Sequence, residues 1–185
     1  MIRAAEHELT RIRVDMIEEV EIKWITRIWV NPKGAIHMKT CFFIGHRDAP
    51  ESIYERLLSA VERHISEYGV TDFVVGRYGN FDRLAARAVI EAKQQRSDVT
   101  LTLLMPYYRA DANPLPDSFD GSLFPDGLET VPKRAAILRA NQYMIHHCDY
   151  LIAYDAGHIG NSRKLVAEVE EIEGLHIVNI ALAPE

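Results

Sequence analysis

From residue 38 onward the sequence alternates between short apolar runs and longer stretches with helical periodicity. This alternation is typical of βαβ units, in which helices connect parallel strands of one sheet. Most of the runs are apolar enough for strands that are covered on both faces. The sequence therefore predicts an α/β fold with a mainly parallel sheet. The five predicted strands are Thr40 to Ile44, Asp72 to Val75, Val99 to Met105, Tyr150 to Tyr154 and His176 to Leu182.

Capping residues and glycines mark helices in the gaps between these strands. The best-marked helix has Asp48 as its N-cap, Pro50 in its first turn and Gly69 at its end. We expect a three-layer αβα sandwich with a five-stranded sheet in the order 3-2-1-4-5. The other predicted helices run from about Asn80 to Gln95, after Thr130 and Pro132, and from Asn161 or Ser162 to Gly174.

Composition restricts the class of protein. With 185 residues, of which 48% are hydrophobic, the chain can bury a core. It contains neither a run long enough to cross a bilayer nor a signal peptide, so we expect a cytoplasmic protein with no membrane partner. Cys41 and Cys148 read as reduced, buried hydrophobic residues. The net charge of −6 argues against nucleic acid as a partner.

Residues 1–37 do not follow the alternating pattern, so we expect an N-terminal extension (1–37) and a separate α/β domain (38–185). The stretch from Val20 to Val30 alternates like a lone strand, which cannot bury its own face. Either the extension adds an edge strand or a dimer arm, or translation starts at Met38. We favour the second interpretation, and a homo-oligomer stays open.

The segment from Pro106 to Val131 is too long for a plain connection and is rich in Pro, Asp and Gly. Long loops in compact domains are usually lids, binding loops or insertions. This one leaves the sheet at the edge where ligands bind in α/β folds. A lid and a simple surface loop are the two alternatives.

Three glycine-containing turns follow predicted strands, and each leads into a predicted helix. Glycine lets a backbone approach a ligand closely, and helix N-termini favour anions. Tight turns and helix caps alone also require such residues. The shared position of the turns at one edge of the sheet favours a ligand site. The turns are Gly45 to Arg47, Gly76 to Asp82 and Asp155 to Ser162.

The residue types in these turns suit a nucleotide. Arg47 offers a planar, permanently charged group for phosphate, Ser162 a hydroxyl donor, and Asp155 an acceptor for ribose hydroxyls. His46 is expected to contact a ligand oxygen. A zinc site is not expected, because the histidines show no recognised ligand spacing. No cofactor is expected, and P-loop, kinase and triad-hydrolase motifs are absent from the sequence.

Three segments resemble the SLOG superfamily, a Rossmann-like group that includes the DprA/Smf and LOG proteins. Cys41 to Arg47 is similar to the family's opening C-F-x-G-H-R, and Gly79 to Ala85 to its G-x-F-D-x-L. Asn141 to Asp155 is similar to R-N-x-Y-M-I followed by D-x-L-I-A-Y-D. The resemblance covers nearly all of 38–185 and implies a Rossmann-like fold that binds nucleotides or nucleotide-derived molecules. The candidate ligand-binding residues are Gly45, His46, Arg47, Gly76, Arg77, Gly79, Asp82, Asn141, Asp155, Gly157, Gly160, Asn161 and Ser162.

The sequence also departs from the family. Ile159 to Ser162 stands where many relatives have Gly-Gly-Thr, and Ala140 stands where an arginine is common. Leu165 occupies the place of the glutamate that the LOG-type phosphoribohydrolases use. The hydrolysis that those relatives perform therefore does not transfer to this chain, and catalytic residues stay unknown.

Three functions remain open. The first is a sensor or ligand-binding module for a nucleotide-like small molecule. The second is an enzyme acting on an N-glycosidic bond of a nucleotide or nucleoside, with Asp82, Asp155 or Asp111 stabilising a ribosyl cation. The third is a partner-binding protein that uses its long loop or N-terminal strand.

Overall fold

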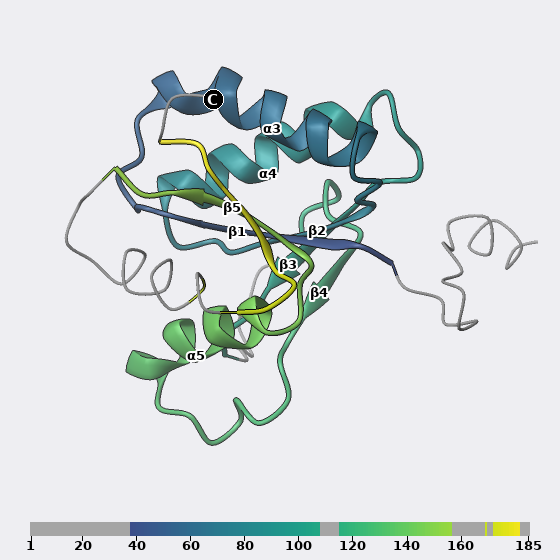
Figure 1. Cartoon of the computed structure of the whole chain (residues 1–185). Helices are drawn as coiled ribbons and strands as arrows, with labels where there is room; N and C mark the ends of the chain where they lie inside the picture. The colour runs from purple at the N-terminus through teal and green to yellow at the C-terminus, as the bar shows by residue number, and fades with distance from the viewer. Residues whose placement is uncertain (1–37, 108–114, 157–168, 170–171, 182–185) are drawn as a thin grey trace, which may run out of the picture. The chain divides into compact units, whose positions relative to one another are not determined.

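The structure is a computed structural model in which residues 38–107, 115–156, 169 and 172–181 are described (Figure 1). The description concerns Lys39–Glu185, one of two units into which the chain divides. The N-terminal extension predicted for residues 1–37 lies outside the described residues, as do parts of the long segment and of the last predicted helix.

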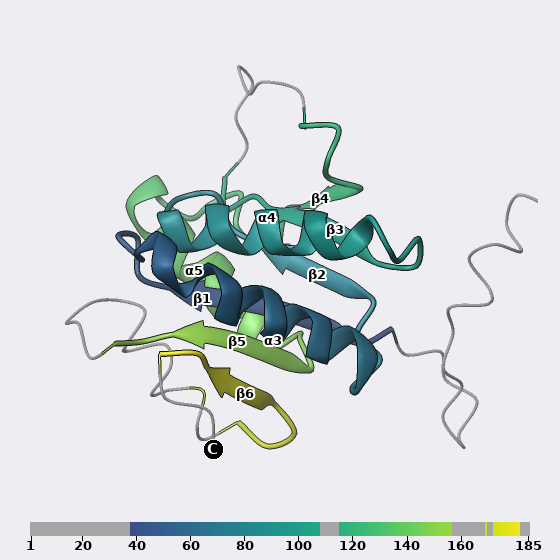
Figure 2. The ribbon, with the colours of Figure 1, turned by 90° about the horizontal axis from the view of Figure 1, so that it is seen from above.

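A parallel sheet forms the centre of this unit. Its strands lie in the order β4-β3-β2-β1-β5-β6, and each pair of neighbours is parallel. Figure 2 shows α3 and α4 over the central strands, with β6 clear of both helices at one edge of the sheet. The strands are β1 (Thr40–Gly45), β2 (Asp72–Val75), β3 (Thr100–Leu104), β4 (Gly121–Leu123), β5 (Tyr150–Tyr154) and β6 (His176–Asn179).

The α/β class is confirmed, but the prediction of five strands is wrong because β4 adds a sixth strand at one edge. The full order differs for this reason, although the five predicted strands keep their order relative to one another. β4 comes from the long segment for which a lid and a simple surface loop were the two alternatives. The Asp120 carboxylate accepts a hydrogen bond from the Leu101 N–H at 2.6 Å, which anchors the start of β4 beside β3.

The helices cover both faces of the sheet. α3 (Tyr54–Ser66) and α4 (Asn80–Lys93) lie on one face, and α5 (Lys133–Ile145) lies on the other (Figure 1). α3 packs on the sheet through an apolar face, on which Leu57, Val61 and Ile65 are buried. Buried aliphatic side chains contribute roughly 1.5–3 kcal/mol each.

The predicted start of the first helix is wrong. A 3-10 turn, η1 (Glu51–Ile53), precedes α3, and Pro50 occupies the N-cap position without a side-chain cap. Asp48 instead donates its backbone N–H to His46 Nδ1 at 3.2 Å. The residues before Pro50 therefore form a loop of their own, which extends beyond the end of β1.

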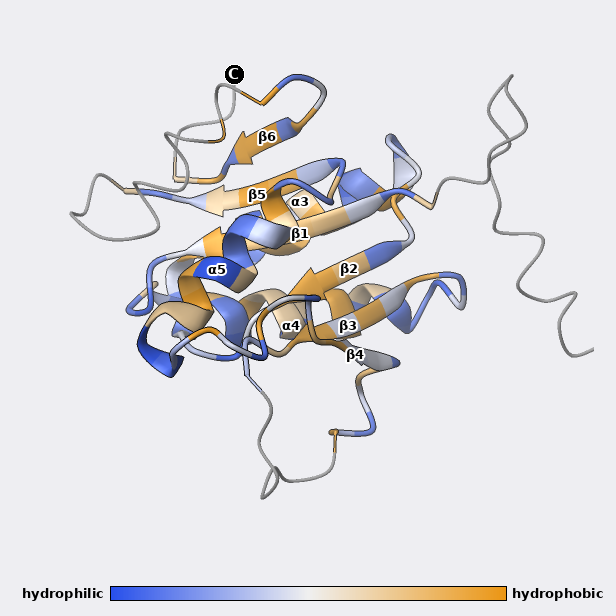
Figure 3. Ribbon diagram, turned by 90° about the horizontal axis from the view of Figure 1, so that it is seen from below, coloured by the Kyte–Doolittle hydropathy of each residue, from blue (hydrophilic) through white to orange (hydrophobic). Residues whose placement is uncertain are grey.

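Successive residues of β1 pack on opposite sides of the sheet, as the pleat requires. Cys41 and Phe43 join the core beneath α3 and α4, while Phe42 and Ile44 join the core beneath α5. Figure 3 shows the central strands coloured as hydrophobic along most of their length. The rings of Phe43 and Phe73 stack with centroids 6.0 Å apart.

The direction in which successive strands are added to the sheet reverses at β1. After β1 the chain passes through α3 to β2, through α4 to β3 and then to β4, and α5 leads it back to β5 on the other side of β1. Open α/β sheets bind ligands near such a switch point, outside the carboxyl ends of the strands. None of the helices in the described ranges has the length and apolar composition of a transmembrane span.

Candidate ligand-binding site

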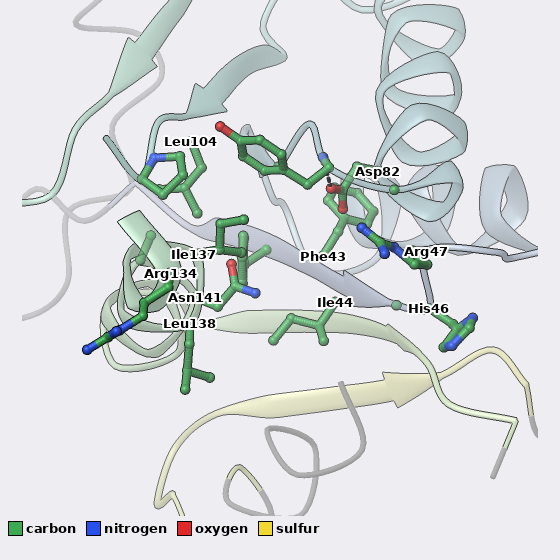
Figure 4. Close-up of a pocket in the computed structure, with 17 residues that line it drawn as sticks. Phe43, Ile44, His46, Arg47, Asp82, Leu104, Arg134, Ile137, Leu138 and Asn141 are labelled. Carbon is green, nitrogen blue, oxygen red and sulfur yellow. Dashed lines mark hydrogen bonds between the residues drawn. The ribbon is translucent and has the colours of Figure 1, made fainter. Parts of the chain in front are cut away.

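A cavity of about 410 Å³ opens at the carboxyl ends of β1 and β3, between the sheet and α5 (Figure 4). The end of β1, the turn after β2 and the first half of α5 form its walls. Its volume is within the usual range of small-molecule sites. Seven of the predicted ligand-binding residues line it, namely Gly45, His46, Arg47, Gly76, Gly79, Asp82 and Asn141.

The structure does not bring every candidate to this cavity. Arg77 is exposed, and neither it nor Asp155 lines the cavity. The backbone N–H and C=O of Asp155 each bond to the Asn179 side chain at 3.2 Å. The other four candidates, Gly157, Gly160, Asn161 and Ser162, lie outside the described residues. Two of the three predicted turns therefore meet at the cavity, and the third contributes nothing that is described.

At two of the glycines, another part of the protein packs directly against the backbone. A Cβ atom on Gly45 would lie 2.2 Å from Phe81 Cγ, and one on Gly79 would lie 2.8 Å from Arg47 Cα. Distances this short are not tolerated between carbon atoms, so both positions need glycine for packing alone. The expectation that these glycines also let a ligand approach closely stays a prediction.

Asp82 holds the turn after β2 in place. Its carboxylate accepts hydrogen bonds from the N–H groups of Tyr78, at 2.8 Å, and of Gly79. This carboxylate, in the first turn of α4, completes half of a capping box. Burial raises the pKa of Asp82, and these hydrogen bonds offset part of the rise.

Three N–H groups at or just before the start of α4 are occupied within the protein. Asp82 accepts those of Tyr78 and Gly79, and the Arg47 carbonyl accepts that of Asn80 at 2.7 Å. These three amides are therefore not available to an anion in the cavity. An anion there would need other donors, such as a positively charged side chain.

Arg47 is the side chain best placed for this role. It lies two residues after the end of β1 and is exposed. Within the described part of the chain, no carboxylate lies within ion-pairing distance of its guanidinium group. Figure 4 shows Arg47 and Asp82 on one side of the cavity, with Ile137, Leu138 and Asn141 of α5 on the other. His46 lies next to Arg47 and is partly buried, with 28% of its side chain exposed.

Sequence reasoning did not identify the wall contributed by α5. Arg134, Ile137, Leu138 and Asn141 line the cavity, and only Asn141 was a candidate. Ile137 and Leu138 lie three and four residues after Arg134, and Asn141 lies four and three residues after them, so the four side chains share one face of the helix. Ile137 and Leu138 are 37% and 38% exposed, which is high for large hydrophobic side chains. The only sign of this wall in the sequence is the mixture of apolar and polar residues on that face of the helix. Such a mixture does not indicate which strand ends the helix lies over.

The arrangement suits a molecule that is part apolar and part anionic. Leu104, Ile44 and the α5 side chains supply apolar surface, while Arg47 supplies positive charge at one end. Among the described residues, no three His, Cys, Asp or Glu side chains are grouped so that they could hold a metal ion.

No protein-family model matches this sequence, and no curated protein matches it either. One similar solved structure is that of the molybdenum cofactor binding protein from the phototrophic bacterium Rippkaea orientalis. The two chains are 14% identical, with a TM-score of 0.52 over 78% of each chain. At this identity the likeness concerns the fold alone, and it agrees with a Rossmann-like α/β fold for this chain.

Proposed function

We propose that the chain is a ligand-binding or sensing module that holds a nucleotide or a nucleotide-derived small molecule in this cavity. The observation that carries the proposal is a cavity with apolar walls and an exposed arginine, Arg47, that has no ion-pair partner in the described part of the chain. Guanidinium groups bind phosphate in a planar, two-pronged geometry. The apolar walls suit the flat ring of a base.

Two further points support a nucleotide-like ligand. The segments that resemble the SLOG superfamily supply Gly45 to Arg47, Gly79, Asp82 and Asn141, all of which line the cavity. The structural neighbour is described as a molybdenum cofactor binding protein, which is one precedent for small-molecule binding in a similar fold.

The enzymatic alternative has less support. Of its two candidate carboxylates in the described part of the chain, only Asp82 lines the cavity, and that group is hydrogen-bonded to the backbone of its own turn. Asp155 does not line the cavity, and Asp111 lies outside the described residues.

The test is thermal unfolding with a panel of purine and pyrimidine nucleosides and their mono-, di- and triphosphates. A ligand at a concentration 100 times its Kd stabilises the folded state by about 2.7 kcal/mol. We expect at least one phosphorylated member to raise the melting temperature without being consumed, as checked by chromatography. Release of a free base would instead support the enzyme.

The matched variants are Arg47→Ala and Arg96→Ala. Both remove one exposed arginine, but Arg96 follows α4 at its opposite end and does not line the cavity. Arg47→Ala should weaken binding by about 1.5–3 kcal/mol, the usual contribution of a charged hydrogen bond. Arg96→Ala should bind like the parent. Equal binding by all three proteins, or no stabilisation by any panel member, would contradict the proposal.

A further inference from the structure

The loop after β1, which carries Arg47, rests on one residue of the neighbouring turn. Asn80 is the first residue of α4, and it contacts this loop twice. Its backbone N–H donates to the Arg47 carbonyl at 2.7 Å, and its side-chain Nδ2 donates to the Ala49 carbonyl at 2.6 Å. One residue thus holds two backbone carbonyls of the loop, one on each side of Asp48.

The orientation of the Asn80 amide follows from chemistry. Its Oδ1 accepts a hydrogen bond from Arg83 Nε at 2.8 Å, and an arginine can only donate. Its Nδ2 therefore faces the Ala49 carbonyl, which can only accept. Arg83 is itself held by an ion pair with Glu51, at the start of η1. The amide is thus fixed from both sides and cannot turn over without losing both bonds.

The two turns are also in direct contact next to these bonds. Gly79 approaches the Arg47 backbone so closely that a Cβ atom there would lie 2.8 Å from Arg47 Cα. The Arg47 side chain makes no ion pair with a described residue, whereas its backbone is held by the contacts above. The bonds from Asn80 supply two of these contacts within the described part of the chain.

We infer that Asn80 is a positioning residue, which sets the place of Arg47 at the cavity without touching the ligand. This inference rests on the proposed function for its effect on binding, but its effect on the loop does not depend on any ligand. Asn80 does not line the cavity. A ligand that binds the Arg47 guanidinium should therefore bind more weakly when the Asn80 side chain is removed.

The test compares Asn80→Ala with Gln95→Ala. Both variants replace an uncharged amide side chain near one end of α4 by alanine, and only Asn80 contacts the loop. Asn80→Ala keeps the backbone N–H that bonds to Arg47 and removes the bond to Ala49. The first readout is hydrogen exchange at the Ala49 amide, which is buried and bonds to the His46 carbonyl at 3.1 Å.

We expect the Ala49 amide to exchange at least about tenfold faster in Asn80→Ala, while amides in the middle of α4 and all those of Gln95→Ala stay as in the parent. The second readout is the affinity for adenosine monophosphate and for adenosine, each by NMR titration. Asn80→Ala should bind the monophosphate about tenfold more weakly. Its interaction with adenosine, which has no phosphate for Arg47, should not change.

Unchanged exchange at Ala49 would overturn the inference, and so would faster exchange with unchanged affinity for the monophosphate. An equal loss for both compounds would also overturn it, because a general disturbance of the cavity would then be the cause. If the parent does not bind the monophosphate, that compound is excluded as the ligand. In that case the exchange result alone tests whether Asn80 restrains the loop.

Discussion

The polar groups at the amino ends of the strands have different partners from those at the carboxyl ends. We call these two sides of the sheet the amino edge and the carboxyl edge. At the amino ends of the strands, acidic side chains accept hydrogen bonds from neighbouring strands. Asp149 accepts from the Thr40 N–H at 2.8 Å, and Asp72 accepts from the hydroxyls of Thr40 and Thr100 at 3.3 and 3.0 Å. At the carboxyl ends, the cavity is lined by arginines without a described ion-pair partner.

Aromatic rings also pack against one another at the amino edge. Tyr150 stacks on Tyr68 and on His176, with centroids 5.3 Å apart in each pair, and His64 packs edge-on against both tyrosines. Groups that satisfy one another contribute to stability, whereas charge left exposed beside apolar surface is available to a ligand. We therefore expect stability to depend mainly on the amino edge, and we propose that binding occurs at the carboxyl edge.

The largest effect is expected for Tyr150→Ala at the amino edge. Tyr150 is buried, and its removal should lower the free energy of unfolding by about 3 kcal/mol, because a cavity forms and two stacked pairs are lost. Urea unfolding measures the loss, and Tyr150→Phe, which keeps the ring, is the control. A loss below about 1 kcal/mol would remove the basis for assigning stability to this edge.

Asp82→Ala tests the comparison at the carboxyl edge, because Asp82 lies there and still has a structural role. The N–H groups of Tyr78 and Gly79 lose their acceptor, so the free energy of unfolding should fall by about 1–2 kcal/mol. Asp82→Asn keeps one acceptor oxygen and should lose less. The same urea experiment measures both variants, and parent-like stability of Asp82→Ala would show that the turn does not need its carboxylate.

The third prediction concerns acid and His64. Burial lowers the pKa of His64 from 6.5, and its Nδ1 lies 2.6 Å from the Ala60 carbonyl. The unfolded chain therefore takes up a proton at a higher pH than the folded chain. The contribution of His64 is complete above about pH 6.5 and is lost as the pH falls below it, by at most about 1.4 kcal/mol per pH unit.

The variant His64→Phe isolates this contribution. The difference in unfolding free energy between parent and variant should change between pH 7 and pH 5, in favour of the variant at the lower pH. Unfolding by urea at several pH values gives this difference. A difference that does not depend on pH would mean that His64 binds protons equally in the folded and unfolded chains.

The smallest effect is expected for Glu51→Gln, which weakens the ion pairs of Glu51 with Arg83 and Arg87 on the surface. Exposed pairs contribute roughly 0–1 kcal/mol, so stability should change by no more than that. The double substitution with Asn80→Ala measures whether the pairs support the Asn80 amide. Strictly additive effects on Ala49 exchange would show that they do not.

Much of the fold could be predicted from the sequence because apolar runs and caps are local signals. The strands at the centre of the sheet are apolar on both faces, and the start of α5 after Pro132 is confirmed. β4 could not be predicted, because Gly121–Leu123 has no apolar pattern of its own and depends on pairing with β3. The predicted cap at Asp48 failed because the chain makes a turn there, with the Ala49 N–H bonded to the His46 carbonyl, and helical residues begin only after Pro50.

The candidate site was predictable in part for the same reason. The turns after β1 and β2 carry local glycine and arginine signals, and strand order brings them together. Which face of α5 lies over the strand ends depends on tertiary packing, so Arg134, Ile137 and Leu138 were not identified. Likewise, sequence patterns do not show that Gly45 and Gly79 are needed for contacts with Phe81 and Arg47.

The most direct test of this account is a map of backbone amide chemical shifts during titration with the panel nucleotide that stabilises the protein most. We predict saturable changes at Gly45 to Arg47, at Gly76 to Gly79 and along the first half of α5, with the amides of Tyr68, Tyr150 and His176 unchanged. Changes centred on the amino edge, or no saturable change with any nucleotide, would contradict the assignment of binding to the carboxyl edge.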